Sequence, residues 1–62
     1  MNKKQALDYF NKYILPAVQD KYEKDGKIDS VARAESWNNW TDHMCKSGEI
    51  SLPQYNNWSN PF

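Results

Sequence analysis

The supply of apolar side chains is the feature that most constrains how this chain can fold. It holds three Trp, four Tyr and two Phe, but its branched aliphatic residues are few: Leu7, Ile14, Leu15, Val18, Ile28, Val31, Ile50 and Leu52. Its mean hydropathy is −1.03, so little other apolar material remains. Aromatic rings carry large apolar areas. We therefore expect them to build most of the core, the contact surface, or both.

The length of the chain allows only one core. With 62 residues, we expect a single helical domain over 1–62 that buries about 60% of its unfolded surface and is marginally stable alone. Cys45 is the only cysteine, so no internal disulfide can staple the fold, and a lone thiol fits a reducing compartment. Self-association into a homo-oligomer would increase this stability, because a second copy buries surface that one chain cannot.

The charge pattern and the N-terminus narrow the class further. Lysines at 3 and 4 are not followed by an apolar stretch, and no apolar run approaches the length of a bilayer span, so we expect no signal peptide, no membrane segment and a cytoplasmic protein. Eight basic and eight acidic residues give zero formal net charge. A protein held by phosphate contacts usually has a basic surplus, and a DNA mimic an acidic one. The balanced charge therefore favours neither a nucleic-acid-binding protein nor a DNA mimic.

Apolar periodicity predicts a long first helix over 3–24. Asn2 and Gln5 form a capping box at its start, and Gly26 is suited to the position after its last turn. Pro16 interrupts the pattern, and a proline inside a helix kinks it. The apolar stripe keeps its phase across the proline, which favours one kinked helix. This stripe comprises Ala6, Leu7, Phe10, Tyr13, Ile14, Ala17 and Val18.

A helix–turn–helix pair is expected to follow. The first helix of the pair spans 30–46, with Asp29 or Ser30 as its N-cap and Gly48 at its end. The second spans 52–58 and begins with the capping box Ser51-Leu-Pro-Gln54. A short extended tail closes the chain. The buried face of the 30–46 helix should carry Ala34, Trp37, Trp40, Thr41, Met44 and Cys45. The fold class is thus all-α, a compact three-helix domain.

No constellation in the sequence supports catalysis or a resident ion. His43 and Cys45 are two residues apart, so on a helix they point about 200° apart, which spoils both a zinc site and a nucleophile–base pair. A calcium-loop register on Gly26 would put Lys21 and Ala32 at positions that need oxygen ligands. We expect no enzyme activity, no metal and no cofactor.

The helix–turn–helix pair leaves a nucleic-acid alternative open. Gln54, Asn56 and Asn57 could read adenine edges, but the 52–58 helix contains no lysine or arginine to hold a phosphate backbone. A compact helical hairpin is the favoured interpretation.

A repeated pattern of rings and amides marks the candidate binding surface. Trp37-Asn-Asn-Trp40 is repeated as Tyr55-Asn-Asn-Trp58, although asparagine is a poor helix former. Tryptophan and tyrosine dominate interface hot spots, and amides give directional contacts. One hypothesis is a protein-binding surface. The other is that the tryptophans fill the core and the asparagines cap ends or face water. The candidate residues are Trp37, Asn38, Asn39, Trp40, Gln54, Tyr55, Asn56, Asn57 and Trp58.

Residues 37–62, with the pattern W-N-N-W-T-D followed by C-K-x-G-x-I and Q-Y-x-N-W-x-x-P-F, resemble small orphan proteins of tailed bacteriophages. The resemblance carries no activity and no site residues. It implies a phage accessory protein in a bacterial cytoplasm, a setting in which such proteins often bind and inhibit a host enzyme or defence complex. Together with the residue-level reasoning, this predicts a non-catalytic protein-binding module that modulates a host protein. The alternative is a small nucleic-acid-binding domain.

Overall fold

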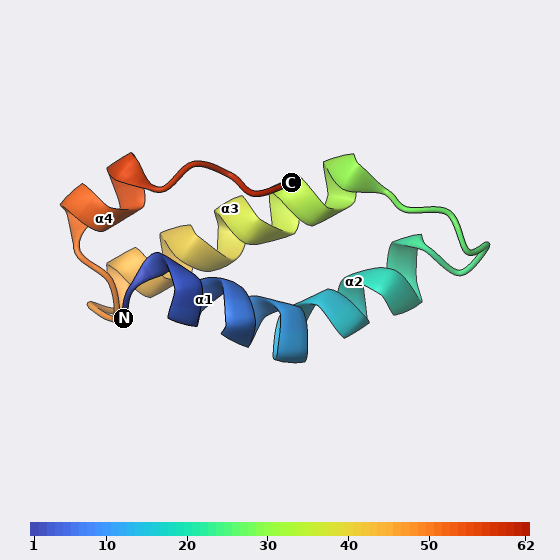
Figure 1. Cartoon of the computed structure of the whole chain (residues 1–62), viewed down its shortest axis with the longest axis horizontal. Helices are drawn as coiled ribbons and strands as arrows, with labels where there is room; N and C mark the ends of the chain where they lie inside the picture. The colour runs from blue at the N-terminus through green and yellow to red at the C-terminus, as the bar shows by residue number, and fades with distance from the viewer.

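The computed structural model describes residues 1–62 and consists of helices joined by turns and a tail (Figure 1). A first helical path runs through α1, a π-helical turn and α2, and two further helices follow. This confirms the predicted all-α class, with a long first helix and a helix–turn–helix pair. The elements are α1 (Lys3–Tyr9), η1 (Phe10–Ile14), α2 (Leu15–Tyr22), α3 (Ser30–Lys46) and α4 (Leu52–Asn57).

The proline in the first helix is accommodated by widening the turn before it. Pro16 would clash with the carbonyl four residues earlier, that of Lys12, and Lys12 lies inside the π turn η1. There the Leu15 N–H donates to the Phe10 carbonyl, five residues back instead of four. A π turn carries one extra residue, so the path bends without breaking.

The extra residue also changes which side chains face inward. Ala6 and Phe10 are buried as predicted, and Val18 is 6% exposed. Tyr13 is 57% exposed and Ala17 is exposed, so their prediction as core residues was wrong. The stripe does not keep its phase, because the π turn rotates the residues within and after it relative to a regular helix.

The first helix ends two residues earlier than predicted, at Tyr22, with Glu23 as its C-cap. The Glu23 carboxylate accepts from the Asp29 N–H at 3.1 Å and takes Arg33 in a bidentate pair, both contacts at 2.7 Å. These bonds tie the end of α2 to the start of α3. Gly26 still adopts a positive φ of 81°, but within the connecting turn instead of directly after the helix.

Both ends of α3 and the start of α4 agree with their sequence signals, and α4 ends at Asn57, one residue earlier than predicted. Asp29 caps α3 by accepting from the Ala32 N–H. Gly48, at φ 84°, ends α3, and the amides of Gly48 and Glu49 donate to the carbonyls of Cys45 and Met44. This pair of hydrogen bonds is a Schellman motif. The capping boxes predicted at the starts of α1 and α4 are both formed.

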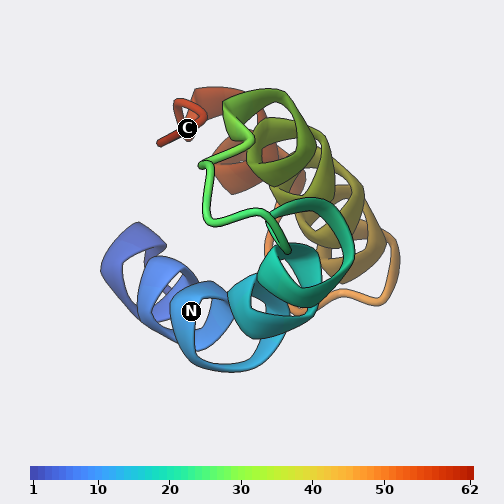
Figure 2. The same cartoon turned by 90° about the vertical axis from the view of Figure 1, so that its right-hand side faces the viewer.

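The helices pack as a thin, elongated body of 37 × 18 × 17 Å. The path from α1 to α2 lies antiparallel to α3, while α4 and the tail turn back along the other side of α3 (Figure 1). In Figure 2, α1 lies at the lower left and the C-terminal tail at the upper left, both beside α3. None of the helices has the length and apolar character needed to cross a membrane.

Aromatic rings build the centre of the core, as the sequence predicts. Ala6, Phe10 and Trp37 form the buried cluster, and partly buried residues pack around it: Leu7, Ile14, Leu15, Trp40, Trp58 and Phe62. Trp37 meets Phe10 edge-on, with ring centroids 5.4 Å apart. The predicted inward face of α3 is buried at Trp37 and Thr41, whereas Ala34, Trp40, Met44 and Cys45 are half-buried.

The C-terminal tail is docked onto α3. The Asn60 side-chain amide donates to the Ala34 carbonyl and to the Asn38 side chain, both at 3.1 Å. The Phe62 ring then lies 5.3 Å from Phe10 and 6.3 Å from Trp37, measured between ring centroids. The tail therefore closes one side of the aromatic cluster.

Candidate protein-binding surface

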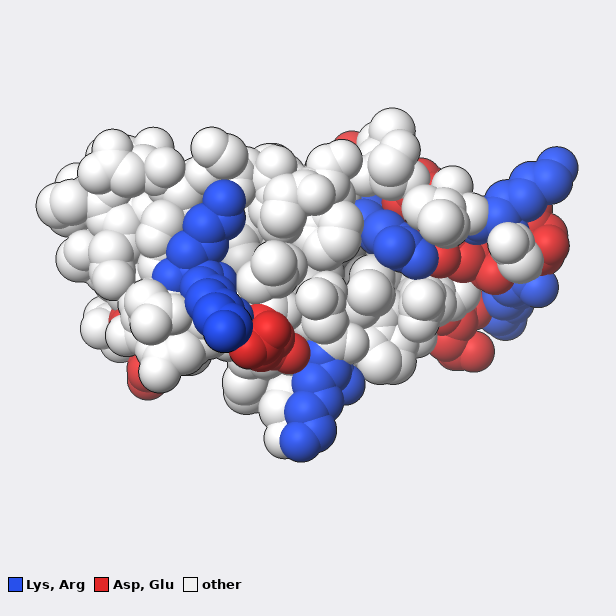
Figure 3. All heavy atoms as spheres, viewed as in Figure 1, with Lys and Arg blue, Asp and Glu red and all other residues white.

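One end of the molecule lacks charged side chains. Residues 50–62 include no Asp, Glu, Lys, Arg or His. In Figure 3 the upper left region, where Figure 1 places α4, is correspondingly free of blue and red atoms. Charged residues are depleted at the centres of protein–protein interfaces. The end built by α4 therefore has the composition of an interface centre.

Local capping chemistry holds α4 in place and uses one of the predicted site residues. The Gln54 side-chain oxygen accepts from the Ser51 N–H at 2.9 Å, and its amide nitrogen donates to the Met1 carbonyl at 2.8 Å. Both ends of this side chain are thus engaged within the chain. Gln54 positions α4 and ties it to the N-terminus, and its amide is not free to read a base edge.

The solvent-accessible side chains of α4 and its C-cap form what we call the α4 surface, which comprises Leu52, Tyr55, Asn56, Asn57 and Trp58. Leu52 is 60% exposed, both asparagines are exposed, and the two rings are half-buried. The side chains of Asn56 and Asn57 form no hydrogen bond within the chain, so their donors and acceptors face solvent. Apolar area and free amides lie together on this short helix.

Residues 37–40 of α3, which carry the matching pattern, are surrounded differently from those of α4. Trp37 is only 2% exposed and belongs to the core. Asn38 is exposed, but its side-chain oxygen accepts from Asn60, so it anchors the tail. Asn39 is exposed without a side-chain hydrogen bond. Trp40 is half-buried and stacks on Tyr9, with centroids 5.7 Å apart and planes at 6°. Only part of the predicted α3 segment is available at the surface.

The structure thus brings the two repeated segments together through the core. Trp40 and Trp58 both pack against the cluster of Ala6, Phe10 and Trp37. The tail that follows Trp58 is bonded to Asn38. All four asparagines are exposed, but Asn38 is bonded to the tail, so only the α4 pair has both side chains free of hydrogen bonds within the chain.

Two exposed tyrosines were missed as candidate surface residues. Tyr9 and Tyr13 are 44% and 57% exposed, and their ring centroids are 4.6 Å apart. With Trp40 they form a short aromatic row beside the π turn. The only sequence signal for them is Pro16, which marks a place where a regular helical phase fails.

A pair of oppositely charged side chains lies at the C-terminal end of α3, the helix that precedes α4 in the chain. The Lys46 ammonium donates to Asp42 at 2.9 Å. This hydrogen bond raises the pKa of Lys46, with a smaller contribution from Tyr55. Lys46 and Asp42 therefore form a pair with no net charge at this end of α3. No group of three or more His, Cys, Asp or Glu side chains gathers anywhere in the chain to hold a metal ion.

Comparisons with known proteins identify no relative of this chain. No family model matches the chain, and no curated protein or solved structure is similar enough to match it.

Proposed function

We propose that this chain is a non-catalytic protein-binding module that recognises its partner through the α4 surface. The observation that carries the proposal is the absence of charged side chains from residues 50–62, combined with an exposed Leu52 and two half-buried rings, Tyr55 on the same short helix and Trp58 at its C-cap. Such a surface loses little free energy when it leaves water, because no ion must be desolvated. The free amides of Asn56 and Asn57 supply direction.

The resemblance of residues 37–62 to small tailed-phage proteins leads us to propose further that the partner is a host protein in the bacterial cytoplasm and that binding modulates it. The nucleic-acid alternative has less support. The α4 helix holds no lysine or arginine, and the Gln54 amide is bonded within the fold.

A charge placed on the α4 surface tests the proposal directly. Leu52 is the first residue of α4, where a negative charge favours the helix, so Leu52→Glu should preserve the fold. Burying an unpaired carboxylate should weaken partner binding at least about 30-fold. The matched control is Ile28→Glu, because Ile28 is 71% exposed and lies in the turn between α2 and α3.

The assay is affinity capture from a bacterial lysate with the wild type and both variants. We expect a stoichiometric host protein to be retained by the wild type and by Ile28→Glu, and lost with Leu52→Glu. Equal capture by Leu52→Glu would contradict the assignment of the surface. Sedimentation of the purified chain separates a host partner from self-association, since a dimer broken by Leu52→Glu would make the partner a second copy.

A further inference from the structure

The C-terminal tail is held to the rest of the fold by two side chains. Residues 59–62 belong to no helix and make no backbone–backbone hydrogen bond, and residues 59–61 are exposed. The Asn60 amide is bonded to α3, and the Phe62 ring packs on the aromatic cluster. Segments with few buried contacts open locally at low cost in free energy. The tail can therefore leave its place without unfolding the helices.

The place where the tail docks lies between the first helical path and α3. Its two oxygen acceptors, a backbone carbonyl and a side-chain amide oxygen, each take a hydrogen bond from Asn60 at 3.1 Å. Its two rings lie 5.3 and 6.3 Å from the Phe62 ring, between centroids, and are at most 2% exposed. A tail that lifts off uncovers apolar rings beside oxygen acceptors. We call this place the tail seat, and it comprises Phe10, Ala34, Trp37 and Asn38.

The tail enters its seat as a preformed turn. The Asn60 side-chain oxygen accepts from the Phe62 N–H at 2.9 Å, which is an Asx turn, and Pro61 between them fixes one backbone angle. The same side chain thus grips α3 through its nitrogen and orients the ring through its oxygen. A segment of the form Asn-X-Phe contains both anchors.

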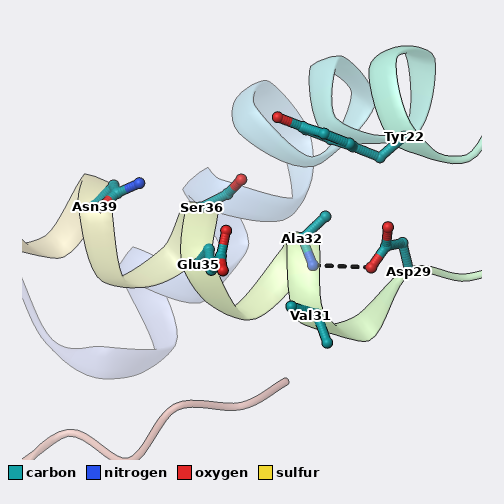
Figure 4. A pocket seen from close by; sticks show the side chains of 7 residues that line it. All are labelled: Tyr22, Asp29, Val31, Ala32, Glu35, Ser36 and Asn39. Carbon is teal, nitrogen blue, oxygen red and sulfur yellow. Dashed lines mark hydrogen bonds between the residues drawn. The ribbon is translucent and has the colours of Figure 1, made fainter.

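The tail seat differs from the small hollow between α2 and α3 because the structure shows what fills it. That hollow, of about 210 Å³, is lined only by residues of α2, of α3 and of the turn between them (Figure 4). In Figures 1 and 4 the tail runs past α3 on the side away from α2. The docked tail is therefore direct evidence of the chemistry that the seat accepts.

We propose that the tail seat is a second binding site, which takes an Asn-X-Phe segment of another protein in place of the chain's own tail. The Phe62 contacts favour the closed tail over the open one about 30-fold. A short tail has an effective concentration on the order of 1–10 mM at its seat. A second copy at micromolar concentration competes poorly with this, whereas a different protein can add contacts outside the seat.

These values fix the affinity expected for an isolated segment. The effective concentration divided by the closed-to-open ratio gives a dissociation constant on the order of 0.1 mM for an open seat. In the wild type only about one molecule in 30 is open, so the apparent dissociation constant rises to about 3 mM. The tail thus acts as a cover that weakens binding about 30-fold.

The test is a titration of the isotope-labelled full chain, wild type and Phe62→Ala, with the peptide acetyl-Ser-Asn-Pro-Phe-amide, followed by NMR. At about 1 mM peptide we expect near saturation of Phe62→Ala and roughly a quarter occupancy of the wild type. Shifts should centre on the amides of Ala34 and Asn38 and on the Trp37 indole. The matched control is Ile28→Ala, a truncation of a side chain that is 71% exposed, which should bind the peptide as weakly as the wild type.

Two altered peptides separate the anchors. Acetyl-Ser-Asn-Pro-Ala-amide lacks the ring and should bind Phe62→Ala about 30-fold more weakly. Acetyl-Ser-Ala-Pro-Phe-amide lacks the amide and should bind about fivefold more weakly. The spectrum of Phe62→Ala reports its fold in the same experiment. Should that variant unfold, Asn60→Ala keeps the ring and loosens the tail, and the wild-type peptide should bind it about fivefold more tightly than it binds the wild type.

Four results would overturn the proposal: no shifts at the tail seat of a folded loosened variant, equal affinity for that variant and the wild type, equal affinity of the peptide without the amide, or a dimer in sedimentation that the peptide dissolves. The last result would make the occupant a second copy. The peptide does not probe the α4 surface, so failure here would leave the function proposed for that surface standing.

Discussion

The docked tail provides the sharpest quantitative test of this fold. Phe62 is the last residue, yet its ring packs on Phe10 and Trp37. Full burial of a phenylalanine side chain stabilises a protein by about 1.5–3 kcal/mol, and each aromatic pair adds about 0.5–1.5 kcal/mol. Because Phe62 is only half-buried, the cost of its truncation should be below the roughly 3–5 kcal/mol of a core Phe→Ala change. We expect Phe62→Ala to cost about 2 kcal/mol.

That loss is large for a chain of this size. A native protein has roughly 0.05–0.15 kcal/mol of stability per residue, which corresponds to about 3–9 kcal/mol here. A domain of about 60 residues loses about 4–8 °C in Tm for each kcal/mol, so Phe62→Ala should lower the Tm by about 8–16 °C. Thermal and urea unfolding followed by far-UV circular dichroism measure the change. Tryptophan emission should shift to longer wavelength as Trp37 meets water.

The control for this measurement is Ile28→Ala. Ile28 is also apolar but is 71% exposed, so its truncation should change stability by no more than about 0.5 kcal/mol. A Phe62→Ala variant that unfolds within about 0.5 kcal/mol of the wild type, the scatter of a neutral surface change, with unchanged emission, would refute the docking of the tail and the reasoning built on it.

Three further substitutions, at two positions, test the connections between helices. The pKa of Glu23 is lowered, chiefly by its hydrogen bond from Arg33, so its contribution to stability is present above its unfolded pKa and lost as the pH falls through its folded value. In urea unfolding, Glu23→Gln should destabilise the chain at about pH 7 and progressively less as the pH is lowered below the unfolded pKa. Gly48 has a φ of 84° and nothing within 4 Å of the place where a side-chain methyl group would stand, so Gly48→Ala should cost about 1–2 kcal/mol from backbone strain alone, and Gly48→Asn should cost less. An equal cost for alanine and asparagine would contradict the strain argument.

Much of the fold could be predicted because its signals are local. The capping boxes at Asn2 and Ser51 and the Asp29 cap each depend on residues three apart, so both partners lie within one short stretch of sequence. The Schellman turn at Gly48 is equally local. The bonds that escaped prediction join distant residues, such as Gln54 to Met1 and Asn60 to Asn38. Neither residue pattern indicates its partner, because the partner is selected by packing.

The same difference between local and long-range contacts explains why only part of the candidate surface could be predicted from the sequence. Trp37-Asn-Asn-Trp40 and Tyr55-Asn-Asn-Trp58 are nearly identical as local patterns, but α3 is covered by the first helix on one side and by the tail on another (Figure 2), whereas α4 lies at the end of the molecule (Figure 1). Burial of a ring depends on how many elements surround its helix, and this is not encoded within four residues. In α3, which has several neighbouring elements, Trp37 of the pattern becomes a core ring and Asn38 anchors the tail. A terminal helix leaves its amides free, and for this reason we propose that α4 carries the binding surface.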